Sequence, residues 1–317
     1  MQLVTYRARG GGRLGVVWRD VVLDLRRLSA DQAAQRAARP SRAALLPATM
    51  LELIEGGPAA WARAQAALEY GRALVDRLEP AELGRRRIGQ PLARVTLLAP
   101  IPRPRRNVFC MGRNYVEHAA ERDAAAPERP VFFTKPPSAV IGPGAPIVRH
   151  AITDALDYEV ELAAVVGRGG RDLAADGALA HVFGYMVLND VTARDLQKAH
   201  QQWFKGKSLD TFCPTGPALV TVDEVPDPQA LGIRLRVDGE IRQDASTARM
   251  IFGVAALLAS LSAGMTLEPG DVLATGTPSG VGAASGRYLK PGNVVEAEID
   301  GLGVLRNPVV APTARGE

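Results

Sequence analysis

Residues 152–167 read ITDALDYEVELAAVVG and combine the alternation of a β-strand with three carboxylates. Asp157, Glu159 and Glu161 are two residues apart, so a strand would place them on one face, with successive side chains about 7 Å apart. Like charges this close raise one another's pKa unless a cation lies between them. The stretch is therefore typical either of a solvent-facing edge strand or of a strand that holds a metal ion.

A further carboxylate follows the next apolar run. Residues 182–188, VFGYMVL, have the composition of a buried strand, which stops at Asn189 and Asp190. Glu159, Glu161 and Asp190 have no cysteine or histidine ligand nearby, and such an all-oxygen site suits Mg²⁺ or Mn²⁺. An open site of this kind acts as a Lewis acid on carbonyl or enolate oxygens.

The segment GRNYVEHAAE, residues 112–121, contains His118 and Glu121 three positions apart. On a helical turn the two side chains face the same way, so the carboxylate can orient the imidazole as a general base. The same spacing also occurs in pairs on the surface of a helix. Both interpretations remain open from these residues alone.

Two glycine-containing segments are candidates for binding an anion. QQWFKGKSLDTFCPTGP, residues 201–217, contains Gly206, Lys207 and Ser208, but Gln201 stands where a phosphate-binding loop needs its first glycine. Lys207 can instead offer a positive charge to a substrate carboxylate or enolate, or remain a solvated lysine. GDVLATGTPSGVG, residues 270–282, predicts a strand followed by a loop whose backbone N–H groups could bind an anion, although turn chemistry also explains its glycines.

Composition and charge narrow the class of protein. The 317 residues are 47% hydrophobic and 23% charged, as in folded soluble proteins, and the net charge of +4 comes without a basic run that would indicate nucleic-acid binding. Cys110 and Cys213 have no zinc or disulfide spacing, and the apolar run 254–265 is too short to span a bilayer. We expect a cytoplasmic protein with neither a nucleic-acid nor a membrane partner.

The pattern of elements predicts an α+β fold that is mostly β. Residues 1–28 contain three strand-like runs, QLVTYRA, RLGVVWRD and VVLDLRRL, and helical patterns follow within 47–79. From residue 101 onward short β-branched runs alternate with glycine and proline, with at least one helix, within 249–264. We therefore predict a small N-terminal α+β domain and linker over 1–100, and a mostly antiparallel or mixed β domain over 101–317.

Six segments in order resemble the fumarylacetoacetate hydrolase superfamily over roughly residues 105–310. They are MGRNYVEHAAE, PVFFTKPPSAVIGPGAPI, LDYEVELAAVVG, GYMVLNDVTARDLQ, GKSLDTFCPTGP and GDVLATGTPSGVG. The resemblance implies a mixed β-roll catalytic domain and a homodimer. Residues 1–100 resemble the small extra domain of the longer bacterial members.

The resemblance also implies roles for particular residues. It implies that Glu159, Glu161 and Asp190 hold Mg²⁺ or Mn²⁺, and that His118 with Glu121 activates water. It further implies contacts to the 2-oxo acid or its enolate from Arg194, Gln197, Lys207 and Thr277, of which Lys207 is counted with the catalytic residues.

One departure favours a particular branch. Fumarylacetoacetase of tyrosine breakdown resembles this chain but has a further metal carboxylate seven residues before its catalytic histidine, where this chain has Met111. The departure favours the bacterial branch of acylpyruvate hydrolases and 2-hydroxyhepta-2,4-diene-1,7-dioate isomerases.

The resulting expectation is a divalent-metal-dependent hydrolase that cleaves a C–C bond of an acylpyruvate such as fumarylpyruvate, through a pyruvate enolate. Two alternatives use the same enolate: isomerisation of 2-hydroxyhepta-2,4-diene-1,7-dioate and decarboxylation of oxaloacetate. A third alternative is a non-enzymatic protein that binds a metal and a dicarboxylate. In each case the partner is a small 2-oxo acid or dicarboxylate.

Overall fold

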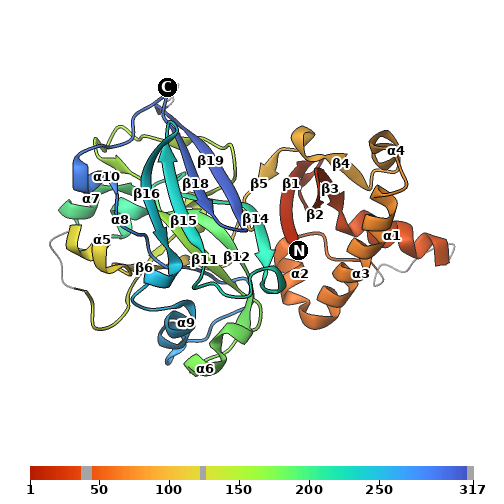
Figure 1. The fold of residues 1–317 in the computed structure, drawn as a ribbon, viewed down its shortest axis with the longest axis horizontal. Coiled ribbons are helices and arrows are strands. Elements are labelled where there is room, and N and C mark those ends of the chain that lie inside the picture. The colour runs from red at the N-terminus through yellow and green to blue at the C-terminus, as the bar shows by residue number, and fades with distance from the viewer. Residues whose placement is uncertain (37–44, 122–125, 313–317) are drawn as a thin grey trace.

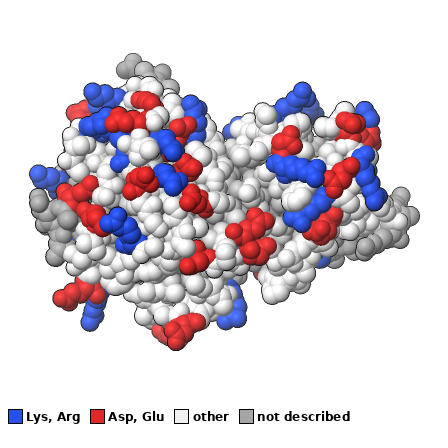
Figure 2. Space-filling model, viewed as in Figure 1, with Lys and Arg blue, Asp and Glu red and all other residues white. Residues whose placement is uncertain are grey.

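The computed structural model describes residues 1–36, 45–121 and 126–312 (Figure 1). Figure 1 shows a larger β-rich part and, beside it, a smaller part that contains the N-terminus and the helices α1–α4. The predicted α+β fold with a mostly β catalytic part is confirmed. Lys, Arg, Asp and Glu side chains are interspersed over the face drawn in Figure 2, in line with the scattered charges of the sequence.

The largest sheet has twelve strands and runs through both parts of the molecule. Its main path is β4 (Gly89–Pro91), β3 (Val21–Asp24), β2 (Gly11–Trp18), β1 (Gln2–Ala8), β14 (Cys213–Thr221), β12 (Val182–Asn189), β11 (Val160–Val166), β17 (Val272–Ala274), β6 (Val108–Gly112) and β7 (Val131–Lys135). Two short strands lie off this path, β5 (Leu97–Leu98) beside β1 and β8 (Val140–Ile141) beside β14.

A second sheet of five strands covers one face of the first. Its order is β16 (Glu240–Ser246), β15 (Gly232–Val237), β18 (Val294–Ile299), β19 (Gly303–Val310) and β9 (Ile147–Val148), and a further pair consists of β10 (Leu156–Asp157) and β13 (Thr192–Ala193). Most neighbouring strands are antiparallel, but β17 with β6, β14 with β8 and β19 with β9 are parallel. The sheets are therefore mixed, as the short runs predicted.

Strand β11 is buried on both faces. Leu162, Ala164 and Val166 contribute to the core between the two sheets, whereas Ala163 and Val165 contribute to the core beneath the N-terminal helices. Successive side chains of a strand point to opposite faces, so this strand separates two hydrophobic clusters. Residues Val160–Val166 of the opening stretch thus form a central strand and not an edge strand. The prediction of one continuous strand is wrong before Val160, because Leu156–Asp157 belong to the separate strand β10 and Glu159 lies between the two strands.

Ten α-helices are found among the described residues. They are α1 (Leu25–Arg36), α2 (Met50–Glu55), α3 (Gly57–Val75), α4 (Pro80–Arg85), α5 (Val116–Glu121), α6 (Ala175–Ala178), α7 (Arg194–Ala199), α8 (Phe204–Lys207), α9 (Val254–Ser262) and α10 (Gly282–Ser285). Helix α3 buries one face, at Ala60, Ala64, Ala67, Leu68 and Gly71. No helix in the described ranges is long and apolar enough to cross a bilayer.

The prediction of a strand over VVLDLRRL is wrong in its second half. The strand β3 ends at Asp24, and α1 begins at Leu25. The Arg27 backbone N–H donates to Asp24 Oδ1 over 2.8 Å, which satisfies one of the free donors in the first turn of the helix. Asp24 thus stops the strand and caps the helix.

The N-terminal strands join the rest of the molecule through β1 and β14. Gln2 pairs with Val220 and Leu3 with Leu219 in antiparallel register. The division predicted near residue 100 falls between β5 and β6, within a sheet that extends across it. This pairing ties the N-terminal part to β14, next to the strands that carry the candidate site.

Candidate active site and metal centre

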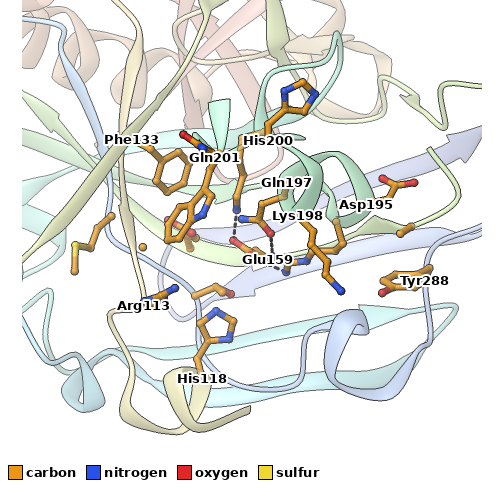
Figure 3. Close-up of a pocket in the computed structure, with 18 residues that line it drawn as sticks. Arg113, His118, Phe133, Glu159, Asp195, Gln197, Lys198, His200, Gln201 and Tyr288 are labelled. Atoms are coloured by element: carbon orange, nitrogen blue, oxygen red, sulfur yellow. Dashed lines mark hydrogen bonds and ion pairs between the residues drawn. The ribbon is translucent and has the colours of Figure 1, made fainter. Parts of the chain in front are cut away.

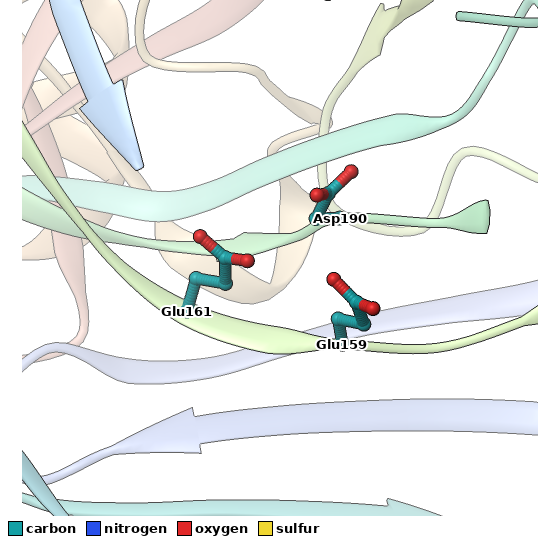
Figure 4. A group of neighbouring side chains, drawn as sticks. All are labelled: Glu159, Glu161 and Asp190. Carbon is teal, nitrogen blue, oxygen red and sulfur yellow. The ribbon is translucent and has the colours of Figure 1, made fainter. Parts of the chain in front are cut away.

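Three acidic side chains meet where β11 and β12 lie side by side. One ligand oxygen of each of Glu159, Glu161 and Asp190, here called the carboxylate cluster, lies within 4.8 Å of the other two (Figure 4). The antiparallel register brings them together, because Val160 pairs with Asn189 and the Asp190 N–H donates to the Glu159 carbonyl over 2.8 Å. All three residues are buried.

Two buried lysines neutralise part of the cluster. Lys207 Nζ donates to Glu159 Oε2 over 2.7 Å and to Asp190 Oδ2 over 2.6 Å. Lys135 Nζ binds the other Asp190 oxygen, Oδ1, and the Val191 carbonyl at 3.1 Å. Lys207 is therefore not a solvated lysine, and Lys135 is a second cation of the site that sequence reasoning missed.

Glu161 is the member of the cluster without a cationic partner among the described residues. It accepts a hydrogen bond of 2.8 Å from the Gly276 N–H. Burial, with the charges of Asp190 and Glu159, raises the pKa of Glu161 well above its usual range. Burial acts in the same direction on Glu159, but Lys207 and Arg194 outweigh it and hold the pKa of Glu159 well below its usual range.

These residues fit a divalent cation. The donors are buried carboxylate oxygens that lie close together, and for one of them, Glu161, burial and the charges of Asp190 and Glu159 outweigh the stabilisation from Lys207 and the Gly276 N–H. A hard cation with oxygen ligands removes that repulsion. Glu159, Glu161 and Asp190 would hold it, which is the set that the resemblance implies.

Asp157 lies near the cluster but has a different role. Arg194 Nε donates to Asp157 Oδ2 over 2.7 Å, and Arg194 Nη2 donates to Glu159 Oε1 over 2.6 Å. Arg194 Nη1 donates to Gln197 Oε1 over 3.1 Å, which places two predicted substrate contacts, Arg194 and Gln197, in one network on α7. Four buried carboxylates thus meet three buried cations, so excess negative charge remains for a metal ion.

His118 and Glu121 both lie on α5. His118 Nδ1 is 3.6 Å from Glu121 Oε2, and neither atom has a hydrogen-bond partner among the described residues. The other carboxylate oxygen, Glu121 Oε1, accepts the Gly280 N–H over 2.7 Å. The carboxylate is thus fixed from one side and faces the imidazole with the other, an arrangement in which it can orient the ring and stabilise a positive charge on it.

The loop after β17, residues 275–283 and called here the glycine loop, binds carboxylates of the protein itself. Its N–H groups at Gly276, Gly280, Gly282 and Ala283 donate to Glu161, Glu121 and Asp157 over 2.7–2.9 Å. The sequence suggested that such a loop could bind an anion through its backbone. In the structure, the anions that the loop binds are the carboxylates of these three side chains.

Thr277 holds the strand that carries the cluster. Its hydroxyl donates to the Val160 carbonyl over 2.9 Å and accepts from Gln243 Nε2 over 2.9 Å. Gln243 Oε1 accepts the Val160 N–H over 3.0 Å. The sequence predicted Thr277 as a substrate contact and gave no indication of Gln243. A glutamine on β16 carries no local signal of contact with β11.

A cavity of about 750 Å³ opens beside the carboxylate cluster (Figure 3). Among the predicted residues, the lining includes His118, Glu159, Glu161, Arg194, Gln197, Lys207 and Thr277. Glu121 and Asp190 are not among the residues that line it. Sequence reasoning did not assign several other lining residues, including Arg113, Phe133, Lys198, Trp203 and Tyr288.

The β-rich fold, the buried carboxylate cluster and the histidine–carboxylate pair at one cavity define the class of metal-binding enzymes that act on small ligands. Residues 107–310 match the family described as fumarylacetoacetate (FAA) hydrolase, C-terminal. The chain belongs to the fumarylacetoacetate hydrolase family, and the predicted resemblance is confirmed. The N-terminal strands and helices precede the matched region.

Three proteins that are similar to this chain are named for different activities. Oxaloacetate tautomerase YisK of Bacillus subtilis is 44% identical over 269 residues, which cover 83% of this chain and 87% of that protein. A solved 2-hydroxyhepta-2,4-diene-1,7-dioate isomerase from Mycobacterium marinum is 31% identical, with TM-score 0.70, 99% of this chain and 100% of that chain covered. Maleylpyruvate hydrolase from Sphingobium sp. SYK-6, solved with manganese(II) and pyruvate, is 32% identical at the same coverage, with TM-score 0.75.

Proposed function

We propose that this protein is a metal-dependent enzyme that interconverts the enol and keto forms of a 2-oxo acid of the oxaloacetate type. The observation that carries the proposal is the placement of His118, which lines the same cavity as the carboxylate cluster and turns Nδ1 toward Glu121. Nε2 is then the nitrogen left to exchange a proton with a ligand. Similarity to the Bacillus subtilis tautomerase at 44% identity supports this reaction above the others.

The cation is Mg²⁺ or Mn²⁺, held by Glu159, Glu161 and Asp190. The all-carboxylate donor set supports either ion, and the Sphingobium relative was solved with manganese(II). A divalent cation in this position supplies Lewis-acid stabilisation of negative charge on carbonyl and enolate oxygens.

The side chains of this protein move the proton. In the keto-to-enol direction, His118 Nε2 takes a proton from the carbon next to the 2-oxo group. The C–H electron pair forms the new C=C bond, and the π pair of the 2-oxo carbonyl moves to its oxygen. The Glu121 carboxylate stabilises the imidazolium, which then returns the proton to that oxygen. Lys207 contributes a fixed positive charge beside the site of charge development, since burial between two carboxylates keeps it in place.

The test measures enol absorbance loss from oxaloacetate in the presence of Mg²⁺, with pyruvate assayed in parallel. We expect the protein to accelerate the absorbance loss without forming pyruvate, and His118→Ala to lose about 10²-fold or more of this rate. Pyruvate formation from oxaloacetate would indicate decarboxylation. An unchanged rate in His118→Ala would remove His118 from the reaction.

Hydrolysis of an acylpyruvate is the second candidate. It is favoured by the cavity of about 750 Å³, which is much larger than a four-carbon acid needs, and by a dyad that can activate water as well as shuttle a proton. The test uses fumarylpyruvate: pyruvate release that requires His118 indicates C–C hydrolysis, whereas absorbance loss without pyruvate indicates isomerase chemistry.

A further inference from the structure

The cations that line the cavity fall into two groups. Arg194 and Lys207 are buried and already bound to protein carboxylates. Arg113 and Lys198 are exposed and have no carboxylate partner among the described residues. The second group is therefore available to an anionic ligand in a way that the first is not (Figure 3).

Arg113 is the most firmly held member of the second group. Its guanidinium lies over the Trp203 ring, 5.5 Å from the centroid, and Trp203 in turn meets Phe133 edge to face at 5.5 Å. The preceding residue has to be glycine, because a Cβ on Gly112 would lie 2.3 Å from Trp203 Cζ3. The indole thus packs directly on the backbone that carries Arg113.

The backbone of Arg113 is also unusual. Its φ of +59° lies in the left-handed region, which a residue with a side chain rarely adopts. Such conformations persist where the surroundings impose them, and they concentrate at ligand sites. Ring contact and backbone together aim an unpaired guanidinium at a cavity that also contains His118 and Glu159.

Building on the proposed 2-oxo acid chemistry, we propose that Arg113 is the specificity-determining residue that binds a second carboxylate of the substrate, remote from the 2-oxo acid end. A guanidinium binds a carboxylate through two parallel N–H donors, and stacking on an aromatic ring leaves those donors free. Lys198 adds positive charge to the same lining, but no aromatic ring contact is found for it among the described residues. The cavity has room for a dicarboxylate longer than four carbons.

The test compares substrates that differ only in the remote charge. Enol loss is measured with oxaloacetate and with its 4-methyl ester, using Mg²⁺-loaded wild-type protein, Arg113→Met, Arg113→Lys and Arg103→Met. Arg103 is a matched control, since it is exposed and lies outside the cavity. Thermal unfolding of each variant verifies that the fold is retained.

We expect wild-type protein to favour oxaloacetate over the ester by at least tenfold in kcat/KM. Arg113→Met should reduce this ratio by about tenfold or more, mainly through KM for oxaloacetate, Arg113→Lys should give an intermediate ratio, and Arg103→Met should keep the wild-type ratio. A wild-type ratio near one, or an unchanged ratio in Arg113→Met, overturns the proposal.

A binding measurement separates this inference from the reaction itself. If wild-type protein converts neither substrate, the proposed function fails, and calorimetric binding of 2-oxoglutarate and its 5-methyl ester to the Mg²⁺-loaded protein decides the inference. Tighter binding of the diacid that Arg113→Met abolishes supports the role of Arg113. Equal binding of the two compounds, or binding of neither, overturns it.

Discussion

The Gly280 N–H donates to Glu121 Oε1 over 2.7 Å, and this bond links the glycine loop to the helix that carries His118. The same loop donates from Gly276 to Glu161 and from Gly282 to Asp157. One segment of backbone therefore positions Glu161 of the proposed metal site, the carboxylate of the proposed dyad and the carboxylate that binds Arg194. A shift of this loop would disturb all three at once.

Gly280→Ala should lower kcat by about 10–100-fold, because small displacements of catalytic groups are costly. Gly280 has φ +100°, and a Cβ there would lie 2.0 Å from the Arg242 carbonyl, so the loop must move. The matched control is Gly286→Ala, which has φ +72° but open space around the added carbon. Steady-state kinetics should show the large loss in the first variant alone; equal losses would mean that backbone handedness, and not the loop position, is responsible.

Glu161→Gln should stabilise the metal-free protein while abolishing metal binding. Glu161 is buried, and burial together with Asp190 and Glu159 raises its pKa, so a neutral amide removes an unfavourable charge. We expect a gain of about 1 kcal/mol, or roughly 2 °C in Tm. Thermal unfolding in a chelator and calorimetric titration with Mg²⁺ or Mn²⁺ measure the two effects.

The matched control for this variant is Glu296→Gln, an exchange on β18 where the carboxylate pairs with Arg306 at the surface. It should change neither metal affinity nor Tm by much, since surface pairs contribute little. Metal affinity retained in Glu161→Gln would contradict the assignment of the carboxylate cluster.

The strands and the cluster could be predicted from sequence because their signals are local. Alternation predicts that Glu159 and Glu161 point the same way, and the two side chains do lie together although Glu159 stands one residue before β11. The end of the apolar run at Asn189 marks where the next strand leaves the core. Only the antiparallel register between Val160 and Asn189 had to come from the structure.

The remaining parts of the site depend on contacts distant in sequence. Lys135 meets Asp190 across 55 residues, and Gln243 meets Val160 across 83. Nothing next to either residue indicates such a partner, because lysine and glutamine usually lie at the surface.

Lys135→Met should destabilise the protein by about 3 kcal/mol in the absence of metal, since it leaves a buried carboxylate with one cation fewer. Asp190 keeps Lys207, which limits the loss. Saturating Mg²⁺ should reduce the difference from wild type, because a bound cation replaces the missing charge and stabilises the folded state by mass action. Urea unfolding with and without Mg²⁺ measures the free energy of unfolding of both proteins.

The control variant is Lys205→Met, on the exposed side of α8, which should lose less than about 0.5 kcal/mol. An equal loss in both variants would contradict the role of Lys135.

Acid should weaken the N-terminal part through Asp31. Burial tends to raise the pKa of this carboxyl, but hydrogen bonds from Arg86 and Tyr70 outweigh it and lower the pKa. A depressed folded pKa means that the interaction is fully present above the unfolded value of about 4 and is lost as the pH falls through the folded value. Because Asp31 is partly exposed, we expect it to contribute about 1 kcal/mol to the free energy of unfolding.

Urea unfolding should show Asp31→Asn less stable than wild type at pH 7, with the difference in free energy of unfolding closing toward pH 3. Asp20→Asn, an exposed control, should match wild type throughout, and a gap in Asp31→Asn that persists at low pH would show that the loss is not electrostatic.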